Sequence, residues 1–156
     1  MAHGNSEMNQ ELRHFFTCWF SGWAQGLETL DAASRTRMLH ACGKACAASY
    51  TLQVFREAKA ASTDLNTFMQ ELSLCFPDAR YEWDGLDTIL VTYLACGCDL
   101  VRFGLVNSPL LCECSTENLK ENFQAALGKP VSVVLESSIL RGGAQCILKV
   151  TLGNVD

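Results

Sequence analysis

The stretch "STENLKENFQAALGKPVSVVLESSILRGGAQCILKVTL" (residues 115–152) decides the fold class, because it places one helix directly before two strands. A hydroxyl group of Ser115 or Thr116 can cap the start of the helix, and Gly128 is the kind of residue that ends one. Beyond it, two apolar runs rich in β-branched residues flank Arg141-Gly142-Gly143, which is typical of a hairpin. This stretch therefore predicts a helix followed by an antiparallel hairpin.

Upstream of this stretch, the hydrophobic pattern changes from a helical to a strand-like period. Apolar residues recur at three- and four-residue spacing up to Pro77, which disfavours a helical conformation in the residue before it. After Pro77, β-branched and aromatic residues dominate, with a turn at Asp84-Gly85. We expect helices over 12–30, 35–50 and from 65 to Pro77, and strands over 79–84, 87–96, 99–106 and 110–114.

This order of elements predicts an α+β fold. N-terminal helices should pack on a mainly antiparallel sheet, with one helix inserted before a C-terminal hairpin. The length of 156 residues suits one domain with a substantial core. We expect that domain to span 9–153 and residues 1–8 to form a flexible N-terminus.

The composition restricts the classes of partner. The net charge is −5, and no segment concentrates basic residues. Because nucleic acids and anionic lipid surfaces attract clustered Lys and Arg, we expect neither nucleic acid nor membrane as a partner. The longest aromatic run without Asp, Glu, Lys or Arg, residues 14–27, is too short to span a bilayer, and the acidic residues Glu7 and Glu11 before it are unlike a signal peptide. A cytoplasmic location is therefore expected, with a small molecule, a metal or a second copy of the chain as partner.

Nine cysteines are present, and six of them form three close pairs. One pair is separated by a single helical turn, a second flanks a glycine at the end of a strand, and a third alternates along an expected strand. Each pair can present both sulfurs on one side, and thiolate sulfur suits zinc or another soft metal. The candidate metal ligands are Cys42, Cys46, Cys112, Cys114, Cys96 and Cys98.

Other interpretations of these residues remain open. Free cysteine is often buried, so Cys42 and Cys46 can simply pack a helix against its neighbour. Ser49 stands where a CxxxCxxC iron–sulfur motif would need its third cysteine. A cysteine with a lowered pKa could instead act as a nucleophile. The aromatic helix from Phe15 to Trp23 could join two copies of the chain into a homodimer.

The second half of the chain resembles the L-2-amino-thiazoline-4-carboxylate hydrolase-like proteins and the allied vinyl-reductase-type small-molecule-binding domains, including bacterial members of that group. The resemblance rests on "CGCDLV", "LLCECSTENLKENFQAALGKPVSVVLESSILRGGAQCILKV" and "CGKACA". The shared pattern is a strand cysteine, a short helix and a hairpin that ends in Gly-Gly-x-x-Cys; here these are Cys96 or Cys98, Cys112, helix 116–127 and Gly142 to Cys146. The resemblance implies helices on an antiparallel sheet around a ligand-sized pocket. In the named hydrolases, it implies cleavage of a cyclic C–N bond.

These observations lead to one main expectation of function and two alternatives. The main one is a cytoplasmic small-molecule- or metal-binding domain with a cysteine-lined pocket between the helix of Cys42 and Cys46 and the sheet. The first alternative is a hydrolase of a cyclic C–N bond with a cysteine nucleophile. The second is a non-catalytic, dimeric interaction protein.

Overall fold

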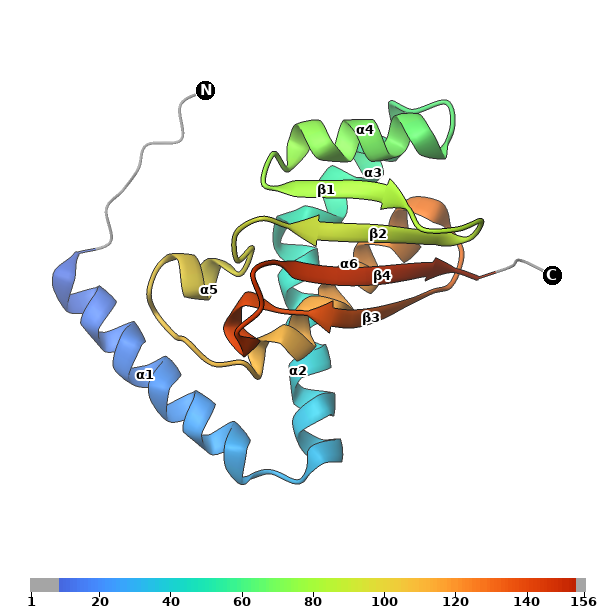
Figure 1. The fold of residues 1–156 in the computed structure, drawn as a ribbon. Helices are drawn as coiled ribbons and strands as arrows, with labels where there is room; N and C mark the ends of the chain where they lie inside the picture. Colours follow the sequence, from blue (N-terminus) through green and yellow to red (C-terminus); the bar gives the residue numbers. More distant parts are fainter. Residues whose placement is uncertain (1–8, 154–156) are drawn as a thin grey trace.

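The computed structural model describes residues 9–153 and has an α+β fold, as the sequence predicts (Figure 1). Four antiparallel strands pair in the order β1-β2-β4-β3, and helices cover one face of the sheet. The expected flexible N-terminus, residues 1–8, lies outside the described residues. The strands are β1 (Ala79–Trp83), β2 (Thr88–Tyr93), β3 (Val131–Ser137) and β4 (Cys146–Leu152).

The helical elements follow the predicted order in the first half of the chain. One continuous helical rod contains a π-helical turn, η1, in its middle, where the expected second helix lies. The elements are α1 (Gln10–Thr29), α2 (Ala32–Cys46), η1 (Ala47–Thr51), α3 (Leu52–Ala60), α4 (Leu65–Cys75), α5 (Asp99–Arg102), α6 (Leu111–Leu127) and the 3-10 turn η2 (Ile139–Arg141). Between residues 9 and 153, no helix combines the length and apolar character needed to cross a bilayer.

The core lies between the sheet and the helices α3, α4 and α6. Alternate residues of the strands point toward it, as the period of two requires, and Ile89, Val91 and Val150 are fully buried. On the helical side, the ring of Phe123 lies 5.3 Å from that of Phe55 in an edge-to-face arrangement. Burying side chains of this size contributes about 2 to 3 kcal/mol each. The hairpin and α6, which the sequence predicts together, therefore supply one half of this core.

The contact between α2 and α6 depends on a glycine. Gly43 is buried, and a Cβ atom at this position would overlap the backbone oxygen of Cys114 and approach the Cβ of Glu117 to 2.9 Å. Glu117 itself is only 4% exposed, and its carboxylate lies 3.5 Å from Nδ1 of His40 and 3.7 Å from Nζ of Lys44. The absence of a side chain at Gly43 thus allows α2 to approach α6 closely enough for His40 and Lys44 to contact Glu117.

The prediction of a strand over 99–106 is wrong. Residues Asp99–Arg102 form the short helix α5, and Gly104, with a φ of +69°, turns the chain after it. Cys98 is the N-cap, and Asp99 places a negative charge in the first turn, which favours a helix start. These local signals override the β-propensity of Val101 and its neighbours.

The prediction of extended backbone over 110–114 is also wrong, because this segment forms the first turn of α6. Pro109 precedes that turn, and proline is compatible with the start of a helix. The buried face of α6 then continues from Leu111 to Phe123. Because residues two apart on a helix point about 200° apart, Cys112 and Cys114 do not share a face.

The glycine contact gives a first prediction. Gly43→Ala is expected to lower the free energy of unfolding by about 1 to 3 kcal/mol, because the new methyl group meets backbone atoms that cannot rotate away. Gly97→Ala is the control, since its Cβ would meet only ring atoms of Tyr93 at 3.5 and 3.6 Å. Chemical denaturation followed by circular dichroism measures both. Equal stability of the two variants would contradict the close α2–α6 contact.

Candidate functional site

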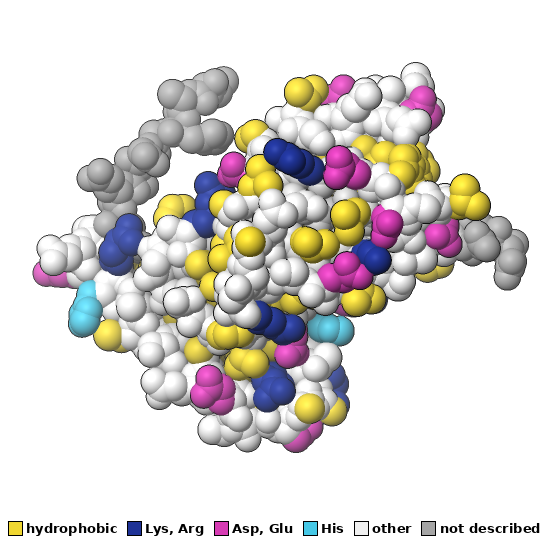
Figure 2. All heavy atoms as spheres, in the orientation of Figure 1, with side chains coloured by type: hydrophobic (Ala, Val, Ile, Leu, Met, Phe, Trp, Pro, Cys, Tyr) yellow, Lys and Arg dark blue, Asp and Glu magenta, His cyan; other side chains and the backbone are white. Residues whose placement is uncertain are grey.

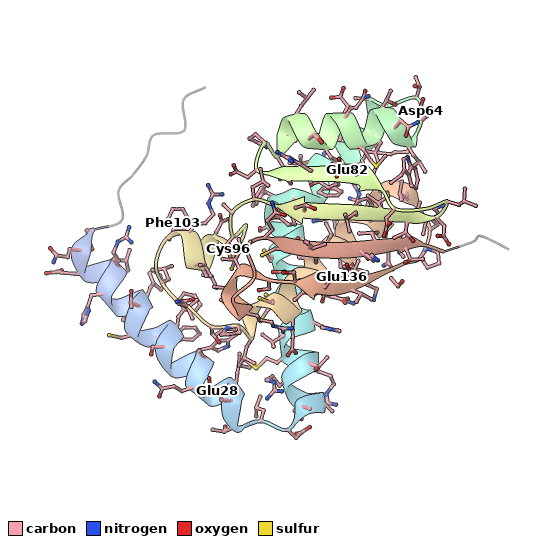
Figure 3. The ribbon with its side chains drawn as sticks, viewed as in Figure 1. Glu28, Asp64, Glu82, Cys96, Phe103 and Glu136 are labelled. Atoms are coloured by element: carbon pink, nitrogen blue, oxygen red, sulfur yellow. The ribbon has the colours of Figure 1, made fainter. Side chains whose placement is uncertain are left out.

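The six predicted metal ligands come from three parts of the fold. They lie on the C-terminal half of α2 (Cys42 and Cys46), on the loop between β2 and α5 (Cys96 and Cys98), and on the first turn of α6 (Cys112 and Cys114). Figure 3 shows Cys96 beside α5, on the loop that leaves the sheet. The helix α2 packs chiefly against α6, and α6 in turn packs against β3 of the sheet. The helix α6 therefore lies between α2 and the sheet, where the sequence led us to expect a pocket.

Cys114 is at the centre of this group. The thiols of Cys98, Cys46 and Cys42 lie near enough to contribute to its raised pKa. Its Sγ donates a hydrogen bond to the backbone oxygen of Leu111 at 3.0 Å. Cys42, Cys46 and Cys98 thus lie in one neighbourhood with Cys114, and Cys112 also lies near the Cys114 thiol.

The other two predicted ligands face the hairpin. The Sγ of Cys112, which is buried, lies 2.9 Å from the hydroxyl oxygen of Ser138. Cys96 lies near Cys98, Cys146 and Cys112. Cys146 accepts a hydrogen bond from the backbone N–H of Ile139 at 3.4 Å, so it acts as a structural residue of the hairpin.

Burial raises the pKa of four of the predicted ligands, Cys46, Cys96, Cys98 and Cys114. Burial, with smaller contributions from the thiols of Cys98 and Cys46, raises the pKa of Cys114 to about 12. A cysteine nucleophile needs a lowered pKa, so these four positions lack the electrostatic activation that such chemistry requires.

In their present rotamers, the described thiols do not form a metal-binding site. Within residues 9–153, no three His, Cys, Asp or Glu side chains converge closely enough to hold one metal ion. A tetrahedral zinc site needs sulfurs about 2.3 Å from the metal. The thiolate metal site therefore stays a prediction, and it would require the side chains of the Cys114 neighbourhood to change rotamer.

A separate groove runs between α1 and the segment 101–109, which comprises the end of α5 and the loop after it. It has a volume of about 620 Å³. Arg13 of α1 bridges to this segment by donating a 2.6 Å hydrogen bond from Nη1 to the backbone oxygen of Phe103. Figure 3 shows Phe103 on the side of α5 that faces α1, and Glu28 near the far end of α1. The groove is lined by Thr17, Ser21, Ala24, Gln25, Glu28, Val101, Gly104, Leu105, Val106, Asn107, Ser108 and Pro109.

The groove combines an apolar wall with a few polar groups. Val101, Leu105 and Val106 come from the 101–109 segment, and Ser21 and Gln25 lie one turn apart on α1. Among the described residues that line it, Glu28 is the only charged one. Figure 2 shows hydrophobic side chains gathering where α1 meets the rest of the molecule. Such a lining suits a small, mainly apolar molecule that carries a hydrogen-bonding group.

Sequence reasoning missed this groove, because it assigned 99–106 to a strand. One available signal was the run Asn107-Ser108-Pro109, which is typical of a loop. A second was the polar stripe Thr17, Ser21 and Gln25, spaced by four residues on the side of the helix away from most of the aromatic rings.

Comparison with known proteins supports the fold. No family model matches the chain, and a search of curated proteins found no significant relative. Among solved structures, the chain is similar to the phenol-responsive sensory domain of the transcription activator PoxR with phenol, at a TM-score of 0.57 and 12% identity, covering 88% of this chain and 74% of that one. It is also similar to a trafficking protein particle complex subunit 3 from Naegleria fowleri, covalently bound to palmitic acid, at a TM-score of 0.54 and 11% identity, covering 91% of this chain and 95% of that one. At such identities the similarity shows a common fold.

The comparisons agree with the α+β fold that the resemblance to the thiazoline-carboxylate hydrolase-like and vinyl-reductase-type group implies, but they confirm neither family. The resemblance stays a prediction from the cysteine and glycine pattern. The hydrolase alternative is also left without the activated thiol that it needs at Cys96, Cys98 or Cys114.

The thiol environments predict an order of alkylation. At pH 8 a thiol with a pKa of about 12 is ionised in only about one molecule in ten thousand, and only the thiolate reacts. Cys18 and Cys75, which are exposed, are expected to react with iodoacetamide first, and Cys112 and Cys114 last. Peptide mapping by mass spectrometry measures the rates, with guanidinium-unfolded protein as the control. Labelling of Cys114 as fast as Cys18 in the folded protein would contradict its burial and restore the nucleophile hypothesis.

Proposed function

We propose that this chain is a small-molecule-binding domain that takes a neutral, mainly apolar ligand in the groove between α1 and the 101–109 segment. The observation that carries this proposal is the lining of the groove, which combines apolar side chains of the 101–109 segment with hydroxyl and amide groups of α1. Its volume of about 620 Å³ lies in the usual range for sites that hold one small organic molecule.

The charge of the lining favours a neutral ligand. An anionic ligand would meet the carboxylate of Glu28 without a cation among the lining residues to balance it. A hydroxyl group on an aromatic body can instead exchange hydrogen bonds with Ser21, Gln25 or Asn107. The similarity in fold to a phenol-responsive domain and to a palmitate-bound subunit supports an apolar ligand class.

The binding test uses 2-naphthol and its anionic counterpart 2-naphthoate as probes. We expect 2-naphthol to bind at least about tenfold more tightly, because only the naphthoate must place a charge near Glu28. Chemical-shift changes in ¹⁵N-labelled protein should concentrate on residues 101–109 and on the polar side of α1. Shift changes that are absent at millimolar 2-naphthol, or that lie elsewhere, would overturn the proposal.

A matched pair of variants locates the binding site. Ser21→Trp places a large ring in the groove from an exposed position and is expected to weaken 2-naphthol binding at least about tenfold. His14→Trp places the same ring on α1 outside the groove lining, and its affinity should stay that of the wild type. Equal affinities of both variants would move the site away from this groove.

A second candidate function is thiolate metal binding, and the gathering of Cys42, Cys46, Cys98 and Cys114 favours it. Loaded protein would hold about one equivalent of zinc, which elemental analysis of anaerobically purified protein measures. Cys114→Ser is expected to abolish that content, whereas Cys18→Ser, on the exposed surface, retains it. Less than about a tenth of an equivalent of any transition metal in the wild type would remove this candidate.

A further inference from the structure

One face of α1 is left uncovered by the described part of the chain. Leu12, Phe15 and Trp19 are 44%, 56% and 55% exposed, although they are large apolar residues. Ala24 and Leu27, on another side of the helix, are buried and hold α1 against the body. Exposed apolar side chains of this size on one face typically mark an interaction surface.

The uncovered face continues into two glycines. Leu12, Phe15, Trp19, Gly22 and Gly26 follow one another at alternating spacings of three and four residues. This is the spacing of positions a and d in a heptad, so the five residues form one stripe along α1, here called the outer stripe.

Packing within a single chain does not require glycine at positions 22 and 26. A Cβ atom at Gly22 or at Gly26 would meet no atom within 4 Å. Glycine is a weak helix former, so two of them on one exposed face disfavour the helix that carries them. Glycine on a helix surface does, however, allow another helix to approach closely.

We propose that the outer stripe packs against the same stripe of a second copy, with the two α1 helices antiparallel. Phe15 and Gly26 are equally far from the midpoint between Phe20 and Ser21, and so are Trp19 and Gly22. A two-fold axis through that midpoint therefore places each large ring over a glycine of the other copy. Antiparallel pairing of positions a and d produces this alternation of large and small residues.

A second copy fits this stripe better than other partners. None of the five residues is charged, so two copies do not repel each other along the stripe. An anionic lipid surface would favour basic residues beside it, but α1 carries Glu11, Arg13 and Glu28 and has a net negative charge. The stripe also provides its own complementary shape, which a symmetric dimer requires.

The contact is one helix long, so it lies at the small end of specific interfaces, and we expect a dissociation constant on the order of micromolar. Sedimentation velocity from about 1 to 200 μM measures it, a range that brackets such a constant. Gly22→Trp and Trp19→Ala are each expected to weaken the dimer at least about tenfold, because the first fills the space that the partner's ring occupies and the second removes the ring.

The double variant Trp19→Ala with Gly22→Trp is the decisive measurement. It exchanges large and small residues between paired positions, so an antiparallel pair regains its complementarity and the dimer should return. His14→Trp, off the outer stripe, should dimerise as the wild type does. Helix content by circular dichroism confirms that each variant is folded.

Three outcomes would overturn the proposal. The first is a wild-type protein that is monomeric at about 200 μM, which is well above a micromolar constant. The second is stronger association of Gly22→Trp, which would indicate non-specific apolar contact. The third is binding of the wild type to phosphatidylserine vesicles without self-association. The outer stripe and the ligand groove involve different residues of α1, so failure of either proposal leaves the other intact.

Discussion

The structure depends on the close approach of α2 and α6 at Gly43. Because this position has no side chain, the backbone oxygen of Cys114 and the Cβ of Glu117 lie directly against α2. Glu117 can then be buried beside His40 and Lys44 of α2, in addition to Lys120 of its own helix, and these partners offset the cost of burying its charge. The same approach brings the cysteines of α2 next to the first turn of α6. The thiol neighbourhood is thus a consequence of how the two helices pack.

The predictable part of the fold consists of segments whose local signals and tertiary environment agree. The end of α6 at Gly128 and the hairpin after it have strong local signals, and the structure confirms both. The predicted helix start at Ser115 or Thr116 is wrong, because α6 already begins at Leu111. Residues 99–114 behave differently. Their β-branched residues suggest strands, but the charge at Asp99 and the buried face beginning at Leu111 favour helices, and packing decides between them.

The wrong strand prediction for residues 110–114 also affected the predicted metal site. Two cysteines that share a face of a strand can bind one ion, whereas Cys112 and Cys114 on a helix point in different directions. The grouping of Cys42 and Cys46 with Cys98 and Cys114 depends on contacts between α2 and segments more than 50 residues later, so spacing alone could suggest but not establish it. The groove beside α1 was missed for a related reason, since its second wall is formed by the end of α5 and the loop after it, where a strand was predicted. This chain is only 11 to 12% identical to structures of the same fold. Ligand specificity therefore depends on the side chains that line the groove and cannot be inferred from the fold.

The π-helical turn η1 changes the direction in which residues point along the long helical rod formed by α2, η1 and α3. Leu39, Gly43, Ala47, Thr51 and Phe55 are spaced by four residues each. Every step of four on an ideal α-helix drifts by about 40°, so the last residue of this series would point about 160° away from the first. The wider turn of η1 takes up part of this drift. Thr51 can thereby donate a 3.1 Å hydrogen bond to Asn122 of α6 while Leu39 and Phe55, at either end, stay buried. The rod can therefore be regarded as two helices joined by a built-in one-residue insertion, in which the number of residues between Cys46 and Leu52 sets the rotation of α3 relative to α2.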